Sequence, residues 1–227
     1  MVRVLGCVVA LMIPAAASAA GLADISNRDA INGLKEALVR GSHAAVARLS
    51  VEDGFFRNGS VKIALPPSLR SVEAVMRSIG MGAQADDLIL RMNRAAETAV
   101  PRARSLLVDA VKNMSVQDAK GILTGGDDAA TQYFRRTTSE PLAKSFRPIV
   151  RRAMAKAKVA EKYNEIAASG SKFGLVKKED ANLEDYVTRR ALDGLFVIIA
   201  EEEKKIRKDP AGAASAVVRK VFGAIQK

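Results

Sequence analysis

The chain has very few of the residues that hold metals or carry out nucleophilic catalysis. Its 227 residues include one histidine, one cysteine and no tryptophan. These counts exclude zinc fingers, cysteine-ligated clusters, c-type haem attachment and disulfide frameworks. The single histidine, His43, lies in an alanine-rich stretch without a recognisable Ser or Cys nucleophile, so it does not indicate a catalytic site. We therefore expect no metal and no cofactor.

Charge and apolar content favour a folded, basic protein. The 36 Lys and Arg residues exceed the 25 Asp and Glu residues and give a formal charge of +11, and 48% of the residues are hydrophobic. This apolar content excludes an intrinsically disordered chain. A chain of this length can bury roughly 70% of its surface on folding, so it needs no metal or disulfide to be stable.

The first 19 residues have the pattern of a cleavable signal peptide. Arg3 precedes an apolar run from Val4 to Ile13, which is shorter than the roughly 20 residues of a membrane-spanning helix. The small residues Ala17 to Ala19 then offer a cleavage site. No later apolar stretch reaches spanning length, so we expect a mature periplasmic chain without a transmembrane segment. Cys7 lies too early in the run for a typical lipoprotein signal, which makes lipid attachment the less favoured alternative.

Helix breakers divide the mature chain into segments. Gly41 is expected to end a first helix, because glycine commonly terminates helices. Pro101 lacks an amide hydrogen and is expected to split a long helical segment in two. Pro141 is expected to open a further helix, since proline is favoured in the first helical turn.

Capping residues mark further helix starts. Ser115 and Asp118 have the spacing of a capping box, and Asn182 precedes a strongly apolar segment as an N-cap. Together with the periodic apolar residues, these signals predict about ten helices. The expected fold class is all-α: one bundle-like helical domain over residues 20–227.

One stretch breaks the helical pattern. From Val61 to Leu65, apolar and other residues alternate as in a β-strand. Phe55 and Phe56 precede it, with a glycine-containing turn between. The sequence therefore predicts a minor β-hairpin near residues 55–65.

Five cations are spaced so that they share one side of a helix. At 100° per residue, Lys144, Arg147, Arg151, Lys158 and Lys162 fall within a sector of roughly 60°. Such a stripe is typical of a surface that binds phosphate groups of anionic lipids or another envelope polyanion, and equally of a solvated face of a basic protein. A nucleic acid partner is not expected, because the chain is exported and the stripe has no interleaved aromatic residues.

Four other polar residues are candidates for a pocket. Asp193 interrupts the most apolar helix in the chain, where a buried charge needs an Arg or Lys partner. It forms either an internal ion pair or, with Arg94, Glu97 and Tyr133, the lining of a polar pocket. The sequence leaves both interpretations open.

Clustered carboxylates are the remaining candidates for acid–base chemistry. They are Asp86-Asp87, Asp127-Asp128 and Glu201-Glu202-Glu203. The first two clusters lie at expected helix starts, where acidic side chains bind free backbone N–H groups. The third has the spacing of ion pairs with the lysines and arginine that follow it. A structural role therefore explains them without catalysis.

Seven strings spread over the mature chain carry a family resemblance. They are Gly33–Leu38, Asp53–Asn58, Val61–Pro66, Met92–Glu97, Asp118–Gly125, Ala129–Phe134 and Tyr186–Phe196. With them, the chain from about Leu22 to Phe222 resembles the bacterial domain-of-unknown-function 4197 family. The resemblance implies an exported, mainly helical envelope protein and transfers no catalytic residue. Some members resemble lipoproteins with a cysteine directly after the signal, a feature that this chain lacks.

The sequence thus favours one function over two alternatives. We expect an exported, periplasmic, non-catalytic binding or scaffold protein that associates with anionic envelope components. The first alternative is a carrier of a small apolar or amphipathic ligand, because alanine and methionine are abundant while aromatic residues make up only 4% of the chain. The second is an enzyme that uses a carboxylate and an arginine.

Overall fold

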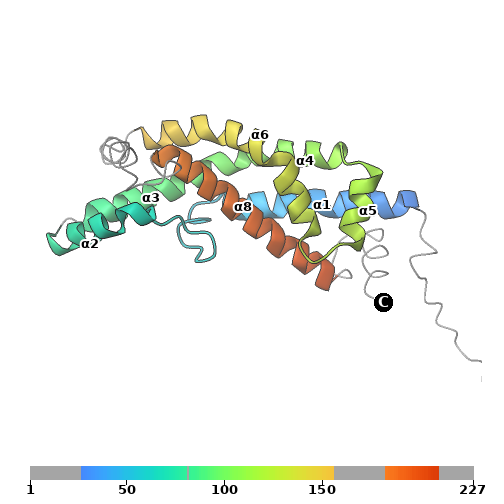
Figure 1. The fold of residues 1–227 in the computed structure, drawn as a ribbon, viewed down its shortest axis with the longest axis horizontal. Coiled ribbons are helices and arrows are strands. Elements are labelled where there is room, and N and C mark those ends of the chain that lie inside the picture. The colour runs from blue at the N-terminus through green and yellow to red at the C-terminus, as the bar shows by residue number, and fades with distance from the viewer. Residues whose placement is uncertain (1–26, 81, 156–181, 210–227) are drawn as a thin grey trace, which may run out of the picture.

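Helices make up all the regular structure in the part of the chain that the structure describes. The computed structural model describes residues 27–80, 82–155 and 182–209 (Figure 1). The elements, in chain order, are α1 (Asn27–Leu49), η2 (Pro67–Leu69), α2 (Arg70–Ser78), α3 (Gly82–Ala99), η3 (Val100–Arg102), α4 (Ala103–Lys112), α5 (Val116–Thr124), α6 (Ala129–Met154) and α8 (Leu183–Lys208). The all-α prediction is confirmed for these residues.

Five helices, α1, α3, α4, α6 and α8, pack together around the hydrophobic core. The long helices α6 and α8 cross in opposite directions, while α2 packs against the start of α3 at one end and α5 lies at the other (Figure 1). The largest fully buried side chains include Phe55, Phe134, Phe146 and Phe196. Burying each of these four side chains contributes about 1.5–3 kcal/mol to folding.

The three predicted helix breakers behave differently. Pro101 separates α3 from α4 through a 3₁₀ turn, as predicted. Pro141 does not open a helix: α6 continues through Pro141 and Pro148 to Met154. Each proline deprives the carbonyl four residues earlier of its helical donor, but both prolines are exposed, so water can reach that carbonyl.

Gly41 also lies inside a helix and does not end one. It faces α8, where an added Cβ would lie 3.5 Å from Ile206 Cδ1 and 3.9 Å from Glu202 Cβ. The next residue, Ser42, is buried, and its hydroxyl donates to the carbonyl of Leu38 at 2.6 Å instead of capping a new helix. Both distances are ordinary van der Waals contacts, so α1 packs against α8 at Gly41 with space left for a small side chain.

The predicted hairpin is not present. Residues 50–66, here called the anchored loop, contain turns and irregular backbone but no strand. The alternation is real, because Val61, Ile63 and Leu65 are buried. However, Ile63 bonds to the side-chain amide of Asn93 on α3: its N–H donates to Oδ1 at 2.8 Å, and its carbonyl accepts from Nδ2 at 2.9 Å. One amide side chain thus takes the place of a neighbouring strand.

Helix α8 supports the anchored loop from a second side. Gly194 lies so close to the loop that an added Cβ would be 2.6 Å from Phe55 Cε1 and 3.2 Å from Val61 Cβ. The Tyr186 hydroxyl also donates to the Ala64 carbonyl at 3.0 Å. The loop is therefore held between α3 and α8.

We expect Gly194→Ala to lower the free energy of unfolding by about 1–3 kcal/mol, because its methyl group overpacks the contact with Phe55. Gly121→Ala is the matched control. Gly121 is exposed inside α5, and an added Cβ there meets nothing within 4 Å, so this change should raise stability by up to about 1 kcal/mol. Urea unfolding followed by circular dichroism measures both. Equal effects of the two substitutions would contradict the close approach of α8 to the loop.

Candidate functional site

The described cations of the predicted stripe all lie exposed on α6. These three residues, Lys144, Arg147 and Arg151, are here called the basic face; Lys158 and Lys162 lie outside the described residues. Lys144 pairs with Glu140 at 2.7 Å, and this contact lowers the pKa of the Glu140 carboxyl. Arg147 pairs with a carboxylate of α8, and Arg151 makes no ion pair with a described residue.

The whole of α6 is strongly basic. Its 26 residues contain one acidic residue, Glu140, and six basic ones, all exposed. The basic residues outside the basic face are Arg135, Arg136 and Arg152. Arg136 donates to Asp118 of α5 at 2.8 Å. Exposed ion pairs of this kind contribute roughly 0–1 kcal/mol each, so an incoming anion can take over such a cation at little cost.

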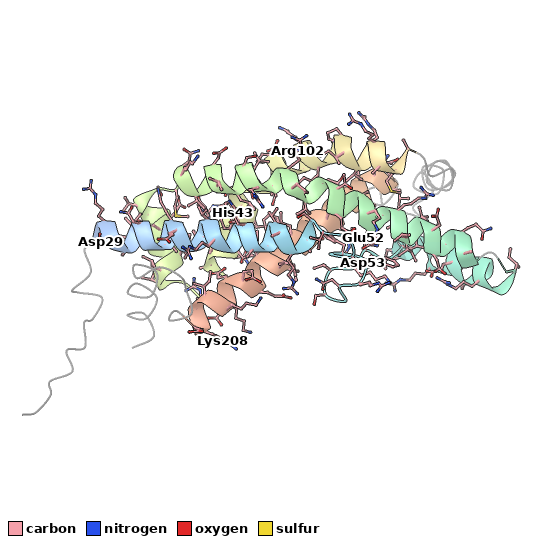
Figure 2. All side chains as sticks on the ribbon, turned by 180° about the vertical axis from the view of Figure 1, so that it is seen from behind. Asp29, His43, Glu52, Asp53, Arg102 and Lys208 are labelled. Carbon is pink, nitrogen blue, oxygen red and sulfur yellow. The ribbon has the colours of Figure 1, made fainter. Side chains whose placement is uncertain are left out.

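Arg94 and Glu97, two of the four predicted pocket residues, do lie together. Arg94 Nη1 donates to Glu97 Oε2 at 2.7 Å, and Arg94 Nη2 donates to Asp53 at 2.7 Å and to Glu52 at 3.1 Å. These hydrogen bonds, the one to Glu97 above all, raise the pKa of Arg94. Asp53 has a positive φ of 66° and also pairs with Arg57 at 2.9 Å. Glu52 and Asp53 lie in the anchored loop just after α1 (Figure 2).

The carboxylate of Glu97 binds the backbone of the anchored loop. Its side chain is only 5% exposed. While one oxygen binds Arg94, the other accepts the N–H groups of Phe55 at 3.0 Å and Phe56 at 3.2 Å. Because both oxygens are engaged, Glu97 positions the loop and has little capacity to serve as a base.

Tyr133 and Asp193 have other partners. The Tyr133 hydroxyl donates to the Ala110 carbonyl of α4 at 2.7 Å, and burial is the main cause that raises its pKa. Asp193 lies 3.5 Å from Arg135 and 3.5 Å from Arg190. The expected pairing of Asp193 with arginine is confirmed, but its side chain is 50% exposed instead of buried, because it lies on the outer side of α8.

The clustered carboxylates bind several different parts of the fold. Asp86 binds Arg77 on α2, and Asp127 and Asp128 are exposed before α6. Glu201 binds Arg48 of α1. Within the described ranges, no group of three potential metal ligands occurs. His43 is partly exposed on α1 (Figure 2).

The described pockets are small or open. The space that α1, α5 and α8 enclose near Leu34, Leu38 and Ile122 has a volume of about 20 Å³. Typical small-molecule sites occupy about 300–1,000 Å³. A depression of about 310 Å³ between α3 and α6 is open to solvent, and both Arg91 and Arg94 line it. No helix among the described residues has the length and apolar content to cross a membrane.

Comparison with known families gives one match. Residues 24–223 match the family described as "Protein of unknown function (DUF4197)". The chain belongs to this family. No curated protein and no solved structure gives a significant match. The resemblance in the sequence is thus confirmed over nearly the whole DUF4197 chain, and the family description assigns it no activity.

The sequence did not reveal the role of Glu203, which with Glu97 is one of two buried acidic residues in the described part of the DUF4197 chain. Glu203 on α8 is buried and accepts the N–H groups of Ala130 at 3.0 Å and Thr131 at 2.9 Å, at the amino end of α6. Arg207 Nη2 donates to Glu203 at 2.8 Å and to the Ile122 carbonyl of α5 at 3.0 Å. Glu203 therefore neutralises the positive end of the α6 dipole from another helix. Only its spacing from Arg207 signals this role in the sequence.

Glu203→Gln is expected to lower the free energy of unfolding by about 3 kcal/mol, because it leaves Arg207 without its buried counter-ion and removes the charge from the end of α6. Glu201→Gln, on the same helix, breaks only a partly exposed pair with Arg48 and should change stability by less than about 1 kcal/mol. Chemical denaturation of both variants at neutral pH gives the comparison. A loss at Glu201 as large as that at Glu203 would contradict the assigned roles.

Proposed function

We propose that this DUF4197 protein is exported to the periplasm and acts as a non-catalytic binding or scaffold protein on an anionic lipid surface. The observation that carries the proposal is the charge of α6, which contains six exposed basic residues and one acidic residue. The signal-peptide pattern of residues 1–19 supports export. Among the surfaces that an exported protein meets, anionic lipid headgroups complement such a helix.

The packing of α6 favours this role. Lys144 and Arg151, the outermost cations of the basic face, are seven residues apart, about 10 Å along the helix axis. Glu203 binds the amino end of α6 and α8 packs against α6, so the backbone that carries the cations is held by other parts of the fold. Each Lys or Arg close to an anionic membrane surface contributes about 1 kcal/mol, and salt screens that attraction.

The two alternative functions have less support. A carrier needs an enclosed apolar cavity, and the enclosed space at α1, α5 and α8 is only about 20 Å³. An enzyme of the carboxylate and arginine type needs these groups to converge on a substrate. The Arg94 and Glu97 pair is instead satisfied by the backbone and acidic residues of the anchored loop.

Co-sedimentation with lipid vesicles tests the proposal. Wild-type protein is expected to bind vesicles that contain phosphatidylglycerol, to bind neutral phosphatidylcholine vesicles weakly, and to dissociate at high salt. The triple variant Lys144→Gln, Arg147→Gln, Arg151→Gln should lose roughly tenfold or more in affinity for the anionic vesicles.

The control variant removes the same charge from the other end of the molecule. It combines Lys120→Gln on α5 with Lys204→Gln and Lys208→Gln near the end of α8 (Figure 2). These three residues form no ion pairs within the described part of the chain, so the control should bind nearly as well as the wild type. Vesicle binding that does not weaken at high salt, or an equal loss of affinity in both triple variants, would refute a role for the basic face.

A further inference from the structure

Asp193 lies between two guanidinium groups on the surface where α6 meets α8. Its Oδ1 is 3.5 Å from Arg135 of α6, and its Oδ2 is 3.5 Å from Arg190 of α8. Charge-assisted hydrogen bonds are shorter, about 2.7–2.9 Å. The carboxylate therefore draws the two cations together, while the N–H groups of neither are tightly bound to it.

Both arginines are accessible, and one is held in place. Their side chains are 44% and 49% exposed, for Arg135 and Arg190 respectively. The Arg135 guanidinium lies 4.7 Å from the ring centre of Phe196, which is fully buried and cannot move aside. This cation–π contact fixes the orientation of the Arg135 guanidinium and leaves its N–H groups free to bind.

We infer that Arg135 and Arg190 form a clamp for a phosphate monoester, such as the headgroup of phosphatidic acid. A guanidinium group binds phosphate through two parallel N–H donors. Two guanidinium groups therefore offer four such donors, which a phosphate group with more than two terminal oxygens accepts best. A monoester has three terminal oxygens and a charge of about −1.5 to −2 at neutral pH. A diester has two such oxygens and one charge, so it fills the clamp less well.

Asp193 is the counter-ion that keeps the positive charges of Arg135 and Arg190 together. A phosphate that enters takes over this role, and its greater charge outweighs the repulsion from Asp193. The site lies on the same junction of α6 and α8 as one cation of the basic face, because Asp185 of α8 binds Arg147 at 2.8 Å. The inference rests on the proposed function: the basic face brings the protein to the lipid surface, and the clamp selects the headgroup.

The test compares two sets of vesicles that contain either phosphatidic acid or phosphatidylglycerol in phosphatidylcholine and are matched in zeta potential. The measured quantity is the ratio of the two affinities at pH 7.4. Wild-type protein is expected to favour phosphatidic acid by roughly fivefold or more, since the monoester offers the two guanidinium groups one more terminal oxygen and a larger charge than the diester.

The double variant Arg135→Lys, Arg190→Lys keeps both charges and removes the paired N–H donors, so its affinity ratio should fall to about one. The matched control, Arg40→Lys with Arg104→Lys on α1 and α4, should keep the wild-type ratio. Asp193→Asn should raise the affinity for phosphatidic acid, because it removes the competing carboxylate. Thermal melts confirm that each variant is folded.

The outcomes separate the two hypotheses. Equal wild-type affinity for the two lipids, or an unchanged ratio in the Arg135→Lys, Arg190→Lys variant, would overturn the clamp and leave attachment through the basic face intact. A wild-type protein that binds neither anionic vesicle would overturn the proposed function itself. Weaker phosphatidic acid binding by Asp193→Asn would show that the carboxylate supports the ligand, against the arrangement proposed here.

Discussion

Two buried carboxylates hold backbone N–H groups that belong to other parts of the chain, and the arrangement of the helices depends on them. Glu203 binds the amino end of α6 from α8, and Glu97 binds the anchored loop from α3. Each is paired with an arginine on its own helix, Arg207 or Arg94. The arginine offsets the desolvation of the carboxylate, and the backbone donors satisfy its remaining lone pairs. Removing either glutamate would leave backbone N–H groups without their acceptor.

This use of charge divides the polar residues of the protein into two groups. The buried charges are saturated by specific partners and determine where α6 and the anchored loop lie. The charges on the outer side of α6 are exposed, and their ion pairs, such as Lys144 with Glu140 and Arg147 with Asp185, lie in contact with solvent. A rigid internal framework and an adaptable outer surface are what a protein needs if it adheres to a surface without changing it chemically.

The sequence predicted those features whose cause lies within a few residues. The capping box of Ser115 and Asp118, the cap by Asn182 and the break at Pro101 are all present, because each depends on neighbouring backbone. Gly41 has the sequence signal of a helix end, yet α1 continues through it and packs against α8. The alternation from Val61 to Leu65 predicted a strand of a hairpin, which is absent, and only the alternating burial of Val61, Ile63 and Leu65 is present. It could not indicate that the partner is a side chain.

The candidate site was predictable only in part, for the same reason. Helical spacing alone placed Lys144, Arg147 and Arg151 on one exposed side. The acidic residues of α8 that pair with α6 are remote in sequence, so the pairs of Arg147 and Arg135 could not be derived. Glu203 stands in a row of three glutamates, and only the crossing of α6 and α8 distinguishes it from its neighbours.

Asn93 and Glu97 lie one helical turn apart on α3, and they bind Ile63 and Phe55, respectively. Since one turn rises about 5.4 Å, both ends of the intervening segment are fixed to a rigid template at a set separation. The contour length of that segment is therefore constrained as tightly as its residue types. Surface loops usually accept insertions and deletions during evolution, but this one would lose an anchor with either.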